Sequence, residues 1–220
     1  MKHPIWEKAY QMLCSRYGEG MPAEILNRYL SEWAEFRETD SIVYFDLLSQ
    51  MRTMASHNGE HIRRKGAAGA SFIAFIMGAT EINPLKPHYY CPHCRKIELV
   101  ETALCGWDLP LKHCSCGKAY VRDGHNLPFE TVRASIRRNV HVDLSVSRHL
   151  YPAVKKMIRT YFEGNTVVSL FRKDQRELET IVIVNEAVPN LTDGQELPFE
   201  EYYDRLRPYA TMTLMVDEEL

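Results

Sequence analysis

The sequence lacks a long apolar run, a strong excess of either charge, internal repeats and low-complexity linkers. Its longest apolar stretch, residues 71–79, is too short to span a bilayer. The first seven residues contain no apolar core of a signal peptide. The net charge of −2, from 27 Lys and Arg against 29 Asp and Glu, gives no overall attraction to nucleic acid or to an anionic membrane. We therefore expect a cytoplasmic chain with no membrane association, in which nucleic-acid binding would require a local basic patch.

The composition is that of an ordinary globular protein, with 45% hydrophobic and 25% charged residues among 220. Apolar spacing predicts two helices within residues 4–36, a short strand at 41–44 and a third helix at 45–55. The strands expected in the second half lie at residues 140–146, 166–171, 178–184 and 209–216. Helices at 71–77 and 150–162 are expected to pack on their sheet. Helices first, followed by strands mixed with helices, indicate an α+β fold.

In a chain expected to be cytoplasmic, six cysteines favour metal binding or free thiols over disulfides. Cys91-Pro-His-Cys94 is a CxxC pair, and His113-Cys114-Ser-Cys116 follows in the same region. Two such pairs direct four soft ligands to one point, which is typical of a structural zinc site. Three ligands are Cys91, Cys94 and Cys116; the fourth is Cys114 or His113, with the softer sulfur favouring Cys114. The cysteines predicted to remain thiols are Cys14 and Cys105.

A glycine-rich segment, residues 65–71, precedes the apolar helix expected at 71–77. Glycines allow a close backbone approach to a ligand, and the N–H groups at a helix start can bind phosphate. The segment does not follow the Walker pattern, and a plain packing turn has the same composition. The pattern alone fits a phosphate-binding loop and a packing turn equally.

His141 and Asp143 lie on one face of the expected strand at 140–146, because strand side chains alternate. Nucleotidyl transfer with two Mg²⁺ ions needs converging carboxylates, and imidazole is a poor Mg²⁺ ligand. The spacing fits an ordinary strand with polar residues on its exposed face equally well.

A long, ordered set of motifs resembles the palm region of the PolC-type bacterial DNA polymerase III. The set comprises Asn83-Pro-Leu-x-Pro-His-Tyr-x-Cys-Pro-x-Cys94, Gly106-Trp-Asp-Leu-Pro110, Cys116-Gly117 and Asp123-Gly-His-Asn-Leu-Pro-Phe-Glu-Thr131. The resemblance covers nearly the whole chain but only a small part of the family's length.

The resemblance implies a nucleotidyltransferase-like, polymerase palm-like mixed sheet with flanking helices and an inserted zinc-binding lobe. It implies three parts: residues 1–87, the helical and loop–helix part of the palm-like domain; 88–125, the zinc lobe; and 126–220, the remainder of the palm-like domain. In the family a loop contacts the incoming triphosphate. The matching nucleotide-binding positions here are Lys65, Gly66, Gly69 and Ser71, with Lys65 standing where the family has arginine.

Several functional residues of the family are replaced. Ala67 and Ala70 stand where the family has serines. The Asp-x-Asp strand becomes His141-Val-Asp143, so one metal carboxylate is lost, and Asp217 is a weak match to the third catalytic aspartate. Losing one ligand of a two-metal site costs many orders of magnitude in rate. The resemblance therefore implies vestigial catalytic residues and, at most, weak Mg²⁺ binding.

We hypothesise a palm-derived pseudoenzyme without polymerase activity, acting as a binding or regulatory scaffold linked to DNA replication. Its expected partner is a protein, with DNA or a nucleotide as a further ligand. One alternative is an active minimal nucleotidyltransferase that uses Asp143, Asp217 and an unrecognised third ligand such as Asp123 or Glu98. The other is a zinc-stabilised DNA-binding module, for which a solvated helix face is the simpler explanation. Its basic residues would be Arg133, Arg137, Arg138, Lys155, Lys156 and Arg159.

Overall fold

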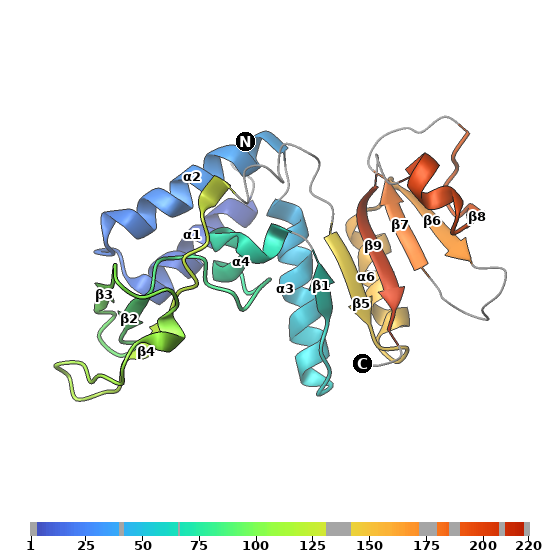
Figure 1. The fold of residues 1–220 in the computed structure, drawn as a ribbon. Helices are drawn as coiled ribbons and strands as arrows, with labels where there is room; N and C mark the ends of the chain where they lie inside the picture. Colours follow the sequence, from blue (N-terminus) through green and yellow to red (C-terminus); the bar gives the residue numbers. More distant parts are fainter. Residues whose placement is uncertain are drawn as a thin grey trace. The chain divides into compact units, whose positions relative to one another are not determined.

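The computed structural model describes residues 4–39, 42–65, 67–130, 142–171, 180–184, 190–206 and 210–217. Contacts divide the chain into two compact units (Figure 1). Unit 1 comprises Met1–Ser49 and Ala67–Arg138, and unit 2 comprises Gln50–Gly66 and Asn139–Leu220. None of the helices in the described ranges has the length and apolar character needed to cross a bilayer.

Unit 1 begins with two helices, α1 (Pro4–Tyr17) and α2 (Ala23–Thr39), as the sequence predicted. Gly18 ends α1 at a φ of +80°, a conformation that glycine adopts without steric cost, and donates its N–H to the Cys14 carbonyl at 2.8 Å. The helices meet through aromatic side chains, including Trp6 and Trp33, whose ring centroids are 5.5 Å apart.

Helix α3 (Ile42–His57) begins where a short strand was expected at 41–44. That expectation is wrong for the described residues, because Ile42, Phe45 and Leu48 recur at helical spacing and are all buried. Burial of this face outweighs the β-propensity of the β-branched residues at the start of the segment.

Helix α4 (Phe72–Ile76) follows the 3-10 turn η1 (Ala67–Ala70) and packs against α1 and α2. The rings of Phe72 and Tyr17 have centroids 6.0 Å apart. The expectation that this helix packs on the sheet is therefore wrong. Nearly all of its side chains are buried, and an apolar stretch that is covered on every side does not reveal its neighbours from its sequence pattern.

The cysteine-containing segment forms a small antiparallel sheet in unit 1, in the order β3-β2-β4. The strands are β2 (His88–Tyr90), β3 (Ile97–Leu99) and β4 (Val121–Asp123). A single turn of 3-10 helix, η2 (Gly106–Asp108), lies between β3 and β4 in the chain. We call this part the cysteine lobe. The division of the chain at residues 1–87, 88–125 and 126–220 stays a prediction.

Unit 2 contains a mixed sheet of six strands in the order β1-β5-β9-β7-β6-β8 (Figure 1). The strands are β1 (Arg63–Lys65), β5 (Val142–Val146), β6 (Thr166–Phe171), β7 (Thr180–Val184), β8 (Glu196–Pro198) and β9 (Ala210–Val216). The β5–β9 and β6–β8 pairs are parallel, and the other neighbours are antiparallel. The expected strands and the α+β, palm-like class are confirmed.

The two faces of this sheet are covered by different elements. Helix α6 (Tyr151–Tyr161) lies behind the sheet in Figure 1, and the π-helical turn η3 (Tyr202–Leu206) lies in front of it. The Tyr202 hydroxyl is 3.3 Å from the Thr213 hydroxyl on β9. Because Thr213 is the β9 partner of Asp143 on β5, Asp143 faces the same side as η3.

Candidate metal centre and palm-like site

Four cysteines of unit 1 come together at one point. Cys91 and Cys94 lie in the turn after β2, and Cys114 and Cys116 lie in the loop before β4. Their Sγ atoms all lie within 4.8 Å of one another. The Cys91 and Cys116 sulfurs are 3.5 Å apart, and the Cys94 and Cys114 sulfurs are 3.3 Å apart. A zinc ion bound at about 2.3 Å by four sulfurs separates them by about 3.8 Å, so the cluster is compatible with zinc.

Backbone hydrogen bonds shape each cysteine pair into a tight turn. In the first turn, the Cys91 N–H donates to the Lys96 carbonyl at 2.9 Å. In the second, which is one residue shorter, the Cys114 N–H donates to the Lys118 carbonyl at 2.8 Å. Gly117 completes the shorter turn at a φ of +81°, where glycine is strongly favoured.

These turns also direct backbone N–H groups at the sulfurs. The Cys94 N–H lowers the pKa of Cys91, and the Cys116 N–H lowers the pKa of Cys114 to about 5. The Lys96 N–H also favours the Cys94 thiolate, but the neighbouring thiols outweigh it and raise the pKa of Cys94 to about 12. Four sulfurs this close can all be deprotonated only beside a cation, so the donor set fits a divalent metal ion.

The candidates for the fourth ligand differ in position. Cys114 belongs to the cluster and is buried. His113 is exposed and pairs with Ala119 in an isolated β-bridge. Cys14 and Cys105 lie outside the cluster.

Motif residues other than the cysteines attach the lobe to the helices of unit 1. The Asn83 amide donates to the Tyr17 hydroxyl at 3.1 Å and to the Asp123 carboxylate at 2.8 Å. Arg16 on α1 lies 3.4 Å from the same carboxylate. The Tyr90 hydroxyl on β2 donates to the Arg16 carbonyl at 2.7 Å. These contacts form a joint between α1, β2 and β4.

Two motif glycines lie where the backbone leaves no room for a side chain. A Cβ atom on Gly106 would lie 2.2 Å from the Asp123 carbonyl oxygen. One on Gly124 would lie 2.3 Å from the Lys86 carbonyl oxygen. The Gly106 N–H donates to the Gly124 carbonyl at 2.7 Å, so this close approach is also a hydrogen-bonded contact within the lobe.

In unit 2, Asp143 lies in the middle of β5 with a strand on each side. Its partner on β1 is Lys65, and its partner on β9 is Thr213. Directly opposed residues of neighbouring strands share a face, so Thr213 lies beside Asp143 on its own side of the sheet. His141, its companion in the sequence motif, lies outside the described residues.

Asp217 lies immediately after β9, four residues beyond Thr213, and its N–H donates to the Val146 carbonyl at 2.8 Å. At the rise of a strand, four residues place it about 13 Å from the level of Asp143. Its carboxylate forms an ion pair with Arg63 at 2.9 Å. The two aspartates therefore lie at different levels of the sheet, and their assignment as catalytic residues stays a prediction.

The two acidic residues considered as a third metal ligand both belong to unit 1 and have partners there. Asp123 accepts the hydrogen bond from Asn83 in the joint. Glu98 on β3 accepts from the Tyr120 hydroxyl at 2.7 Å and forms an ion pair with Lys112. The Lys112 ammonium, followed by the Tyr120 hydroxyl, lowers the pKa of Glu98 to about 2, so this carboxylate is ionised within the lobe.

The glycine-rich segment ends at Ser71, the N-cap of α4. The Ser71 hydroxyl accepts the Ala74 N–H at 3.1 Å and donates to the Glu32 carboxylate at 2.7 Å. The same carboxylate accepts the Phe72 and Ile73 N–H groups at 2.9 and 3.0 Å. An internal carboxylate therefore occupies the helix start at which a nucleotide phosphate was expected.

Sequence reasoning missed Glu32, which is fully buried on α2. Arg28 donates to it at 2.7 Å and also donates to the carbonyls of Leu127 at 2.8 Å and Ala70 at 3.2 Å. The sequence does contain a sign of its burial. Glu32 lies at helical spacing from the buried residues of α2, which are Ile25, Tyr29 and Phe36.

The other positions of the glycine-rich segment do not belong to one element. Lys65 is the last residue of β1, and Gly69 lies in η1. Gly66 lies outside the described residues. Ser71 is therefore the one described position of the set whose side-chain contacts are defined, and those contacts are internal.

Most of the chain is similar to known proteins. A family model described as the bacterial DNA polymerase III alpha NTPase domain matches residues 3–175, which include the cysteine lobe and β5. The DNA polymerase III PolC-type of Streptococcus agalactiae is 35% identical over 163 residues, covering 72% of this chain and 11% of the relative. Those of Bacillus cereus and Thermotoga maritima are 32% and 34% identical, covering 71% and 57% of this chain. The chain spans about a tenth of the length of these relatives.

We expect the purified protein to contain one zinc ion, and the Cys114→Ser variant to lose it, because the cluster then offers three sulfurs. His113→Ala should retain the ion, since His113 lies outside the cluster. Metal content measured by elemental analysis, with Cys105→Ser as the thiol control, checks both. Metal-free wild-type protein, or full zinc in Cys114→Ser, would contradict the assignment.

Gly106→Ala should lower the free energy of unfolding by about 1–3 kcal/mol, because its Cβ meets backbone that cannot move without breaking the lobe. Gly20→Ala is the matched control, since no heavy atom lies within 4 Å of its Cβ position. Denaturant unfolding followed by circular dichroism measures both. Equal stability of the two variants would argue against this close approach.

Glu32→Ala should destabilise the protein by about 3–5 kcal/mol, because Arg28 and the N–H groups at the start of α4 lose their common acceptor. Glu24→Ala, at an exposed position on the same helix, should cost less than about 1 kcal/mol. Thermal unfolding of the two variants tests this difference, and a small effect at Glu32 would refute its central role.

Proposed function

The chain belongs to the bacterial DNA polymerase III alpha family, and we propose that it is a palm-derived member that does not synthesise DNA. In this proposal it acts as a binding or regulatory scaffold linked to DNA replication. Since it spans about a tenth of its PolC-type relatives, the activity of those whole proteins is itself a hypothesis for this chain.

The observation that carries the proposal is the surroundings of Asp143. A pair of Mg²⁺ ions at a palm site would supply charge stabilisation for phosphoryl transfer, and converging carboxylates would be needed to hold them. The strand positions paired with Asp143 are Lys65 and Thr213, neither of which is acidic, and Asp217, just beyond β9, is paired with Arg63. His141 takes the place of the other aspartate of the strand motif. These features favour loss of the metal pair, with weak binding of a single Mg²⁺ at most.

The start of α4 supports the same proposal. The N–H groups that would stabilise a triphosphate donate instead to Glu32 and Ser71. Alanines at positions 67 and 70 supply no hydroxyl for a phosphate. Productive nucleotide binding would therefore have to use other groups.

We infer that the four cysteines hold a structural zinc ion. Four protein sulfurs close the coordination sphere and leave no position for a substrate. The metal would fix the two turns of the lobe, while the joint at Asn83 and Asp123 attaches the lobe to α1. A chain that combines a stable lobe with an altered palm-like site suits a protein that binds a partner. Another protein is our first candidate, and DNA or a nucleotide is the second.

Primer extension tests the absence of synthesis. With Mg²⁺ or Mn²⁺, we expect no product from the wild-type chain on an annealed primer and template. The His141→Asp variant should also be inactive, because one carboxylate does not replace the other missing contacts. A PolC-type relative assayed in parallel shows that the conditions support synthesis.

Extension by the wild-type chain that is abolished by Asp143→Ala would overturn the proposal in favour of an active nucleotidyltransferase. Extension gained by His141→Asp alone would show that a single substitution removed the activity, and that the rest of the palm site is competent.

A further inference from the structure

The cysteine lobe leaves three large apolar side chains in solvent. Leu104, Trp107 and Leu111 have exposed fractions of 84%, 75% and 82%. Every other large apolar residue in the described ranges is at most 47% exposed. Single exposed apolar residues are ordinary, but a tryptophan and two leucines within one short segment form a group that is unfavourable in water. We call residues 104–111 the apolar loop.

The backbone of the apolar loop is held by hydrogen bonds from the strands of the lobe. The Tyr89 hydroxyl on β2 donates to the Pro110 carbonyl at 2.9 Å. The Arg122 guanidinium on β4 donates to the Leu109 carbonyl at 2.7 Å. Leu109 itself is buried in the apolar core of the lobe. The exposed side chains therefore project from a fixed backbone, and a partner that covers them has little of the loop to order.

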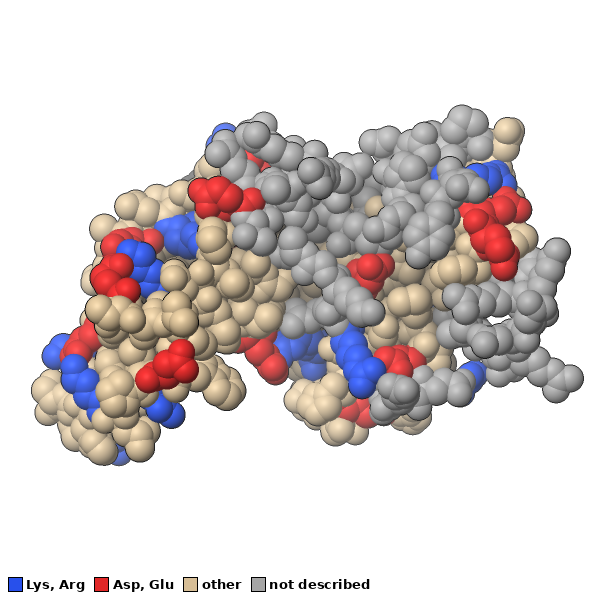
Figure 2. Space-filling model, in the orientation of Figure 1, with Lys and Arg blue, Asp and Glu red and all other residues tan. Residues whose placement is uncertain are grey.

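Most charged side chains near the apolar loop are paired within unit 1. Lys86 pairs with Glu101 at 2.8 Å, and Lys112 pairs with Glu98. In the view of Figure 2, charged side chains of the lobe, at the lower left, stand beside a larger uncharged area. Asp108, which follows the exposed tryptophan, is itself exposed, and its carboxylate has no hydrogen bond or ion pair within the described ranges. A surface that covers the loop must bring a cation to this carboxylate or leave it buried and unpaired.

The size of the apolar loop argues against a second copy of this chain as its partner. A tryptophan and two leucines offer roughly 400 Å² of apolar surface. Two such loops packed together would bury about 800 Å², which is less than the 1,200 Å² or so of a stable interface. A symmetric contact centred on the tryptophan would also bring the two copies of Asp108 towards each other without a cation.

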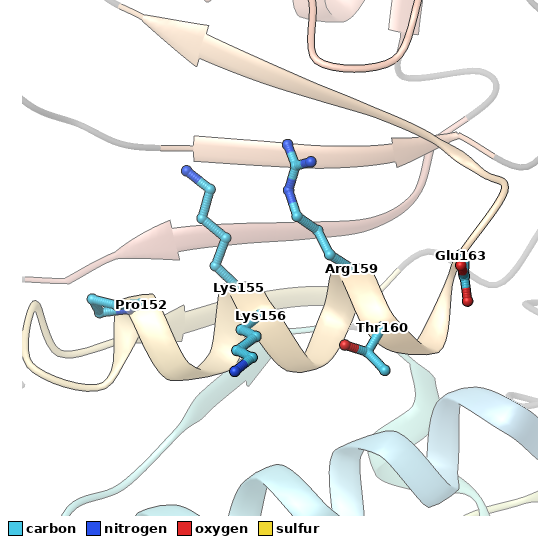
Figure 3. A pocket seen from close by; sticks show the side chains of 6 residues that line it. All are labelled: Pro152, Lys155, Lys156, Arg159, Thr160 and Glu163. Carbon is cyan, nitrogen blue, oxygen red and sulfur yellow. The ribbon is translucent and has the colours of Figure 1, made fainter.

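The hollow on α6 is no better a recess for the loop of a second copy. It has a volume of about 500 Å³ and is shown in Figure 3. Its lining residues are Pro152, Lys155, Lys156, Arg159, Thr160 and Glu163. Such a lining would meet the charge of Asp108 but offers no apolar surface for two leucines. This head-to-tail contact would also repeat from copy to copy and build open chains.

We propose that the apolar loop is the contact surface for a different protein, which presents an apolar recess with a Lys or Arg side chain at its rim. Trp107 fills the recess, Leu104 and Leu111 pack beside it, and the cation pairs with Asp108. A well-ordered tryptophan at the centre of a small apolar group is typical of the residues that carry most of the binding energy. The inference rests on the binding role proposed above and names the surface and the chemistry of its partner.

Photo-cross-linking in the native cell identifies the partner. A photo-reactive phenylalanine analogue replaces Leu104 in the full chain, and the same analogue at Leu30, an exposed position on α2, is the control. We expect one protein to be captured from position 104 and not from position 30. That protein is then purified and used as the probe for binding measurements.

Isothermal titration calorimetry measures the affinity of the purified partner for the full chain. Trp107→Ser should bind more than about tenfold more weakly than wild type. Leu111→Ser should weaken binding in the same direction, whereas the matched change Leu30→Ser should leave it unchanged. Asp108→Asn should weaken binding and make it less dependent on salt. All four side chains are exposed, so thermal unfolding of each variant should match the wild type.

Cross-links only to a second copy of this chain or to nucleic acid, or no cross-link at all, would overturn the proposal. An unchanged affinity in Trp107→Ser would do the same. A protein captured and bound only through position 30 would overturn this surface while leaving the scaffold role in place. None of these results bears on primer extension, so this inference and the absence of synthesis fail separately.

Discussion

A single buried carboxylate, that of Glu32, organises unit 1. Burying a charge costs several kcal/mol unless its hydrogen-bonding capacity is met. Here Arg28, the Ser71 hydroxyl and two backbone N–H groups of α4 supply the donors. Arg28 extends the network to the carbonyl of Leu127, so segments almost a hundred residues apart in sequence share one electrostatic anchor. The glycine-rich segment is thereby fixed by the protein's own charge.

The residues of the cysteine lobe and those of the palm-like site contribute differently to the stability of the fold. The lobe depends on sulfurs, close glycine contacts and buried tyrosines, each of which contributes to the stability of the fold. Catalytic carboxylates contribute no such stability, because grouped negative charges repel one another without their metal. Replacing catalytic groups at this sheet therefore leaves its packing intact.

The sequence predicted correctly those elements that depend on the spacing of residues close together in the chain. The alternating strands of unit 2 and the two cysteine turns follow from repeats of two and three residues, and their positions agree with the sequence. The neighbours of Asp143 depend on strand pairing and could not be read from its motif. The joint at Asn83 and the buried role of Glu32 likewise depend on contacts between distant segments. The short strands β1 and β8 give too few residues for a recognisable alternation.

The position of β9 has a consequence for folding. It follows the other strands in the chain, yet it lies between β5 and β7 in the sheet. The β1–β5 pair and the β7–β6–β8 group therefore cannot join until β9 has left the ribosome. Such long-range pairing slows folding and leaves strand edges unpaired meanwhile. The edges of β5 and β7 stay open to other chains during this interval, so unit 2 is most exposed to aggregation before β9 pairs.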